Sequence, residues 1–191
     1  MEPLKKLFWE EVSEMLHVEG MLLKALLRMQ TAIRGETLKE EIDAYREHAR
    51  VHVDEIKEML ERFELPLREK KCDAMMGLLL KGQHLLQRSG TGAVLDAAIL
   101  SVCRKINSYK VASYSSLQSW AKIILPEEPA VLTALKELLQ NETAAAARFT
   151  KLAAEYDLAA SRQLMDVTPR RNTTAVKRVN AVAEVPRWQQ W

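Results

Sequence analysis

The chain has 191 residues, a formal net charge of +2 and 48% hydrophobic residues. This length suits one domain with its own hydrophobic core, and the near balance of charge argues against a dedicated nucleic-acid binder. No apolar run approaches the length of a membrane span, and residues 1–11 lack the apolar core of a signal peptide. The cysteines Cys72 and Cys103 lack metal-motif spacing, which predicts buried free thiols. We therefore expect a cytoplasmic protein that contacts neither membrane nor nucleic acid.

Helix-forming residues dominate the chain, and glycine and proline are scarce. Apolar residues recur at intervals of three and four, which is the spacing of one helix face. The pattern and its breaks predict helices over about 4–33, 37–63, 70–88, 94–124 and 129–165. No strand pattern is present. The prediction is an all-α fold, an antiparallel four-helix bundle with a short extra helix in the crossover between the second and third long helices.

The helical pattern stops at Asp166, which predicts a bundle domain over 1–165 and a basic, disordered tail over 166–191. The tail ends in Arg187, Trp188 and Trp191, residue types that are enriched in the hot spots of protein interfaces. Two readings stay open for this end of the chain. It either packs on its own bundle or binds a protein partner.

Two glutamates occupy positions where the helix faces are otherwise apolar. Glu19 lies on the stripe of the first helix, between Met15 and Leu22, and Glu142 lies on the stripe of the last, between Leu138 and Ala145. A buried carboxylate is costly unless it meets a metal, a cation or a proton. Carboxylates that project into a helical bundle also build the centres of di-iron and di-manganese proteins.

Three residue strings resemble a known family. They are Lys71-Cys-Asp-Ala-Met-Met-Gly-Leu-Leu79, Asp96-Ala-Ala-Ile-Leu100 and Ile106-Asn-Ser-Tyr-Lys-Val-Ala-Ser-Tyr114. Together they resemble the YciE/YciF-type ferritin-like proteins, bacterial proteins associated with stress responses, and the resemblance spans roughly residues 4–160. It implies a ferritin-like bundle that forms a homodimer. Members of that family often carry carboxylate and histidine ligands for a two-metal centre.

Most of the ligands that the resemblance implies are missing from this chain. Glu19 and Glu142 match acidic positions of the family. Elsewhere the positions that correspond to ligands hold other residues, namely Arg50, Val53, Met76, Asn107, Lys110, and Ala145 or Ala146. A shift of one residue on the second helix would bring in His52, but would pair it with Ala49.

This pattern predicts a buried charge cluster of Glu19, Arg50, Lys110 and Glu142, in which the two cations neutralise the two carboxylates. No metal or other cofactor and no catalytic residue is then expected. The function that follows is a non-catalytic, stress-associated structural or interaction protein. The alternative is a weak iron- or manganese-binding oxidoreductase that uses Glu19, Glu142 and His52 as ligands.

Overall fold

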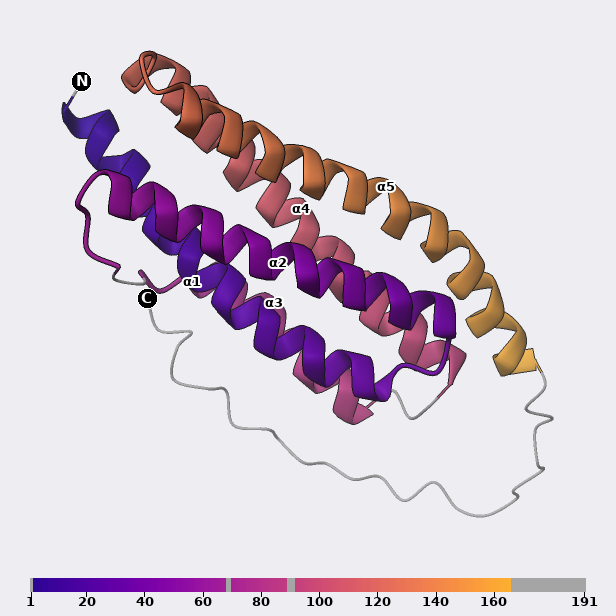
Figure 1. Cartoon of the computed structure of the whole chain (residues 1–191). Coiled ribbons are helices and arrows are strands. Elements are labelled where there is room, and N and C mark those ends of the chain that lie inside the picture. Colours follow the sequence, from indigo (N-terminus) through magenta and orange to yellow (C-terminus); the bar gives the residue numbers. More distant parts are fainter. Residues whose placement is uncertain (1, 68–69, 89–91, 166–191) are drawn as a thin grey trace.

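The computed structural model describes residues 2–67, 70–88 and 92–165 of the chain. These residues form α-helices and no strand (Figure 1). The helices are α1 Glu2–Ala32, α2 Glu36–Arg62, α3 Asp73–Arg88, α4 Ala93–Ile124 and α5 Pro129–Met165. The predicted all-α class is confirmed, and the long helices lie where the apolar spacing placed them. The predicted tail, 166–191, with Arg187, Trp188 and Trp191, lies outside the described residues.

Two helical hairpins face each other to make the bundle. Short connections join α1 to α2 and α4 to α5, and in the bundle α1 also contacts α4 and α2 also contacts α5. The segment between α2 and α4 contains α3, which packs against α1 and α4. This crossover returns the chain to the opposite end of the bundle, so α2 and α4 run in the same direction and each of the four long helices is antiparallel to the long helices that it contacts (Figure 1).

The core runs along the whole bundle and is built from the predicted stripes. Phe8, Met15, Leu22 and Leu26 of α1 are fully buried, and the other three long helices contribute similar sets. Cys72 and Cys103 are both buried and free. None of the described helices is long and apolar enough to cross a membrane.

At one end of the bundle, side chains of α4 and α5 form hydrogen bonds with the backbone of the α1–α2 connection. The buried carboxylate of Asp96, in the first turn of α4, accepts the backbone N–H groups of Arg34 and Gly35 at 3.1 and 2.8 Å. The Tyr156 hydroxyl of α5 accepts the backbone N–H of Leu38 at 3.1 Å. It takes the role of an N-cap side chain, which the N-cap residue Gly35 lacks. Glycine is needed there, because an added Cβ would lie 2.1 Å from the Tyr156 hydroxyl oxygen.

Candidate functional site: a buried ionic cluster

Four ionisable side chains, one from each long helix, meet near the middle of the bundle. Glu19 comes from α1, His52 from α2, Lys110 from α4 and Glu142 from α5. We call these four residues the ionic cluster. All four are 0% exposed, so any charge among them is compensated by the other members and by nearby dipoles instead of by bulk water.

The Lys110 ammonium lies between the two carboxylates. Its Nζ is 2.9 Å from Glu19 Oε2 and 2.7 Å from Glu142 Oε1. Both contacts are ion pairs at short distance, and Coulomb attraction is strong there because little water reaches the site. Nζ also lies 4.7 Å from the centre of the Tyr45 ring, which adds a cation–π contact.

The pKa directions follow from this arrangement. Burial by itself lowers the pKa of the Lys110 ammonium, but the carboxylates of Glu142 and Glu19 outweigh burial and raise that pKa above its ordinary value. Burial likewise raises the pKa of Glu19, but Lys110 and His52 outweigh it and lower that pKa. Lys110 therefore stays protonated and Glu19 stays ionised at neutral pH.

His52 bridges the same two carboxylates from α2. Its Nδ1 lies 3.2 Å from Glu19 Oε1 and 3.5 Å from Glu142 Oε1. The ring makes an edge-on contact with Tyr114, with 5.6 Å between ring centres. The other ring nitrogen, Nε2, has no hydrogen-bond partner among the described residues. The cluster thus contains a buried polar atom without a partner, which is uncommon in a protein core.

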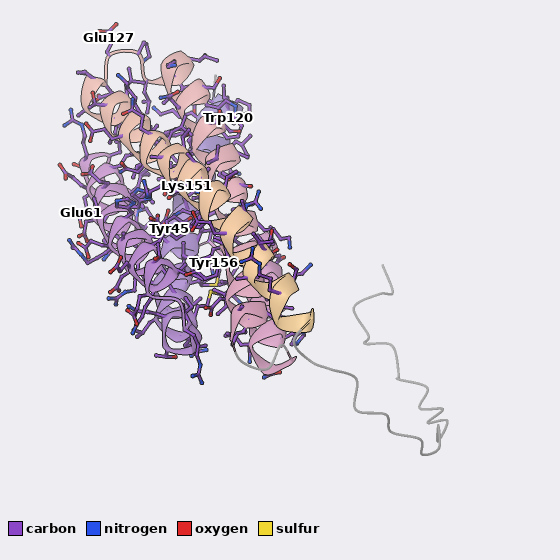
Figure 2. All side chains as sticks on the ribbon, turned by 90° about the vertical axis from the view of Figure 1, so that its right-hand side faces the viewer. Tyr45, Glu61, Trp120, Glu127, Lys151 and Tyr156 are labelled. Carbon is purple, nitrogen blue, oxygen red and sulfur yellow. The ribbon has the colours of Figure 1, made fainter. Side chains whose placement is uncertain are left out.

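Two tyrosines and an asparagine complete the hydrogen bonding of the carboxylates. Tyr114 donates to Glu19 Oε1 at 2.5 Å, and Tyr45 donates to Glu142 Oε2 at 2.9 Å. Asn107 Nδ2 donates to Glu142 Oε2 at 2.7 Å and to the backbone carbonyl of Glu142 at 2.9 Å. Burial and the adjacent carboxylates raise the pKa of both phenols well above the ordinary value, so both keep their protons. Figure 2 shows the Tyr45 ring inside the bundle between the helices.

The prediction that Arg50 belongs to this cluster is wrong. Its guanidinium lies on the outer face of α2, is 56% exposed, and pairs with Glu47 at 2.7 Å and Asp54 at 2.9 Å. The physical reason is helix geometry, because successive residues are about 100° apart and the core side of α2 is fixed by Ala49 and His52. The structure brings Glu19, Lys110 and Glu142 together, and His52 takes the place predicted for Arg50.

Sequence reasoning did not find the roles of Tyr45 and Tyr114. Tyr45 is on the apolar stripe of α2 and counts as a core residue by spacing alone, while Tyr114 stands in a serine-rich stretch. A signal was present in the spacing. Tyr114 follows Lys110 by one helical turn, and Tyr45 precedes His52 by two, so each tyrosine lies on the same helix face as a buried ionic residue.

The side chains present do not fit a two-metal carboxylate centre. Such a centre takes a Glu from each of two helices and a Glu-x-x-His motif from each of the other two. Here α1 supplies Glu19, but α4 has Asn107, α2 has Ala49 and His52, and α5 has Glu142 and Ala145. Half of the donors are absent, and the Lys110 ammonium lies against both remaining carboxylates. Only Glu19, His52 and Glu142 form a group of candidate metal ligands among the described residues.

Residues 3–161 match the family described as "Domain of unknown function (DUF892)". The chain belongs to this family. Protein YciF of Escherichia coli strain K12, which is similar to it, is 28% identical over 154 residues, which is 80% of this chain and 92% of that protein. The predicted YciF-type family is thereby confirmed.

Two solved structures have a similar fold. The crystal structure of the E. coli stress protein YciF superposes with a TM-score of 0.76 at 26% identity, covering 82% of this chain and 98% of that one. YcfI of Rhodopseudomonas palustris, described as a candidate structural protein, superposes with a TM-score of 0.73 at 20% identity. The match covers 77% of this chain and 92% of that one. The second likeness supports the fold alone. The predicted ferritin-like bundle is confirmed by the first.

Proposed function

We propose that this DUF892 protein is a non-catalytic member of the ferritin-like bundles, in which the ionic cluster takes the place of a two-metal centre. The observation that carries the proposal is the position of Lys110, whose ammonium lies 2.9 and 2.7 Å from the carboxylates of Glu19 and Glu142. A cation that is part of the chain supplies the positive charge that iron or manganese supplies in a metal centre.

Charge and donor number both favour this reading. A metal ion beside Glu19 and Glu142 would meet the repulsion of the fixed ammonium in a region with little screening. It would also find too few oxygen and nitrogen donors for a centre with open positions for oxygen chemistry. The remaining carboxylate oxygens are already engaged by the Tyr45 and Tyr114 hydroxyls.

The proposed role is that of a stress-associated structural or interaction protein of the cytoplasm. The similar YciF of E. coli is described as a stress protein, which supports the stress association. The proposal includes a homodimer and binding of a protein partner through Arg187, Trp188 and Trp191. Replacing both tryptophans with alanine should then release the partner while leaving the melting temperature unchanged. A large loss of melting temperature on deleting 166–191 would instead make the tail part of the fold.

A second candidate function is weak metal binding with oxidoreductase activity. It is supported by Glu19, His52 and Glu142, which each offer one ligand atom, and these atoms lie within 4.8 Å of one another. This reading requires Lys110 to leave the carboxylates or lose its proton. The raised pKa of Lys110 opposes the second of these.

Metal analysis of the purified protein separates the two candidates. The protein is loaded with Fe²⁺ or Mn²⁺, desalted and analysed for metal, with the Glu19→Ala/Glu142→Ala variant as background. The proposal expects no stoichiometric metal and an iron oxidation rate equal to that of the variant. Two metals per chain would refute it, and one metal per chain that disappears in the variant would establish the alternative.

A further inference from the structure

A groove lies on the outer surface between α1 and α3, and none of its lining residues belongs to the ionic cluster. Its volume is about 490 Å³, and it is lined mainly by apolar side chains. Among the lining residues, Met76 and Leu80 of α3 are 46% and 51% exposed, although each is large and apolar. Neighbouring exposed apolar residues that line a groove indicate a surface that another molecule covers.

The dimensions of the groove suit one helix. The α1 wall extends from Met21 to Met29 and the α3 wall from Met76 to Leu86. These spans are about 12 and 15 Å long at 1.5 Å per residue, which corresponds to two to three turns of a partner helix. Gly77 lies on the α3 wall, and the space around its Cβ position is open for 4 Å, so a partner backbone can come close there. The methionines of the groove adapt to a partner's apolar side chains.

The positive charges that line the groove favour a partner with negative charges. Lys24 and Arg28 line it on successive turns of α1 and are both exposed. Neither forms a salt bridge within the described residues, and no Asp or Glu is among the described lining residues. The three arginines of α2, by contrast, all pair with a carboxylate, as the exposed Arg50 does with Glu47. The groove thus combines an apolar floor with two uncompensated cations.

We propose that this groove is the docking site for an amphipathic helix of another protein, whose apolar stripe is flanked by Asp or Glu residues. The apolar stripe covers Met76, Leu80 and the other methionines and leucines, and the acidic flanks pair with Lys24 and Arg28. This is the helix-in-groove mode of peptide recognition.

Two other occupants meet unfavourable charge. A second copy of the chain, placed face to face, brings Lys24 and Arg28 of both copies into one interface without a carboxylate from the lining residues. The chain's own segment 166–191 carries five Lys and Arg residues against two Asp and Glu residues, so its net charge has the same sign as that of the groove. An acidic helix from a different protein is the complementary choice.

The test uses the full-length protein and two fluorescent helical probe peptides of about 14 residues with the same leucine stripe. One peptide has glutamates on its flanks, and the other has lysines at the same positions. Fluorescence anisotropy is expected to show saturable binding of the acidic peptide with at least about tenfold preference over the basic one. This preference is expected to weaken as salt is raised, because the flanking charges are exposed.

Variants locate the site. Leu80→Asp is expected to weaken binding of the acidic peptide by at least about tenfold, since it places a charge on the apolar floor. Lys24→Glu/Arg28→Glu is expected to reverse the preference toward the basic peptide. Leu158→Asp is the matched control, because Leu158 is a similarly exposed leucine, at 52%, on α5, and binding should not change.

Three outcomes would overturn the proposal. The first is equal binding of both peptides, and the second is binding that Leu80→Asp leaves intact. The third is a halved molar mass of the Leu80→Asp variant in light scattering, which would make the groove an interface between copies of this chain. Circular dichroism of each variant verifies that it is folded. None of these results depends on the metal content of the ionic cluster, so the proposed function is tested separately.

Discussion

Helix α2 carries ionisable side chains on both of its faces, and the two faces place them in different surroundings. On the inner face, His52 lies 3.2 Å from Glu19 and contacts no solvent. On the outer face, Arg50 lies 2.7 Å from Glu47 and 2.9 Å from Asp54, but its side chain is 56% exposed. The distances are similar, yet water screens the outer pairs and replaces them readily, so ion-pair distance alone does not indicate importance. Water does not reach the inner side chains and therefore cannot replace their partners.

The largest effect is expected for Lys110→Met. This change removes the cation between Glu19 and Glu142 and leaves two buried carboxylates close to each other. We expect a loss of about 3–5 kcal/mol in the free energy of unfolding at pH 7, measured by urea denaturation. A loss below about 1 kcal/mol would mean that the cluster is no more important than a surface ion pair.

The pH dependence of this loss sharpens the prediction. The pKa of Glu19 is lowered in the folded protein, so its contribution to stability is present above its ordinary pKa of 4.5 and is lost as the pH falls through the lower folded value. The pKa of Lys110 is raised, so its contribution is present below 10.5 and is lost as the pH rises through the folded value. The difference between wild type and Lys110→Met should therefore be greatest near neutral pH and shrink in acid. A difference that grows below pH 4.5 would contradict this assignment.

A somewhat smaller effect is expected from metal added to Lys110→Ala. Removing the ammonium leaves Glu19, His52 and Glu142 as a three-donor group around vacated space. We expect Mn²⁺ to restore about 2.7 kcal/mol when its concentration reaches 100 times its Kd, and to leave the wild type unchanged. Thermal melts with and without Mn²⁺ measure this. Lys110→Ala/Glu19→Ala is the control, and a similar rise in its melting temperature would show nonspecific binding.

The next largest effect is expected where Asp96 holds the α1–α2 turn. Asp96→Ala deprives the N–H groups of Arg34 and Gly35 of their acceptors, at an expected cost of about 1–3 kcal/mol. Asp96→Asn keeps one acceptor oxygen and should lose less. Both values come from urea denaturation. Equal losses for the two variants would indicate that the negative charge of Asp96, and not its hydrogen bonding, stabilises this end.

The smallest effect is expected on the outer face of α2. Arg50→Met breaks the pairs with Glu47 and Asp54, which water and salt already weaken. Its urea midpoint should match that of the wild type within error, in low and in high salt. A midpoint shift comparable to that of Lys110→Met would remove the distinction between the two faces.

The sequence predicted the helices well because apolar spacing responds directly to burial. The second predicted helix, 37–63, corresponds to α2 at Glu36–Arg62. Glu19 and Glu142 were found by the same spacing, since each interrupts an apolar stripe. The prediction for Arg50 is wrong because the correspondence with family ligands conflicts with the periodicity of α2, which puts His52 on the core face. The contacts of Tyr45 and Tyr114 could not be predicted, because they depend on how far each of the four helices slides along its neighbours.

The anchoring of the α1–α2 turn has a consequence for how the molecule opens. Asp96 and Tyr156 belong to one hairpin and hold the turn of the other, and the ionic cluster joins the same two hairpins halfway along their length. The two hairpins cannot separate without breaking both the hydrogen bonds at the α1–α2 turn and the contacts of the ionic cluster. Amide hydrogens in the middle of α1 and of α5 should therefore exchange with solvent at the rate of one shared, global opening.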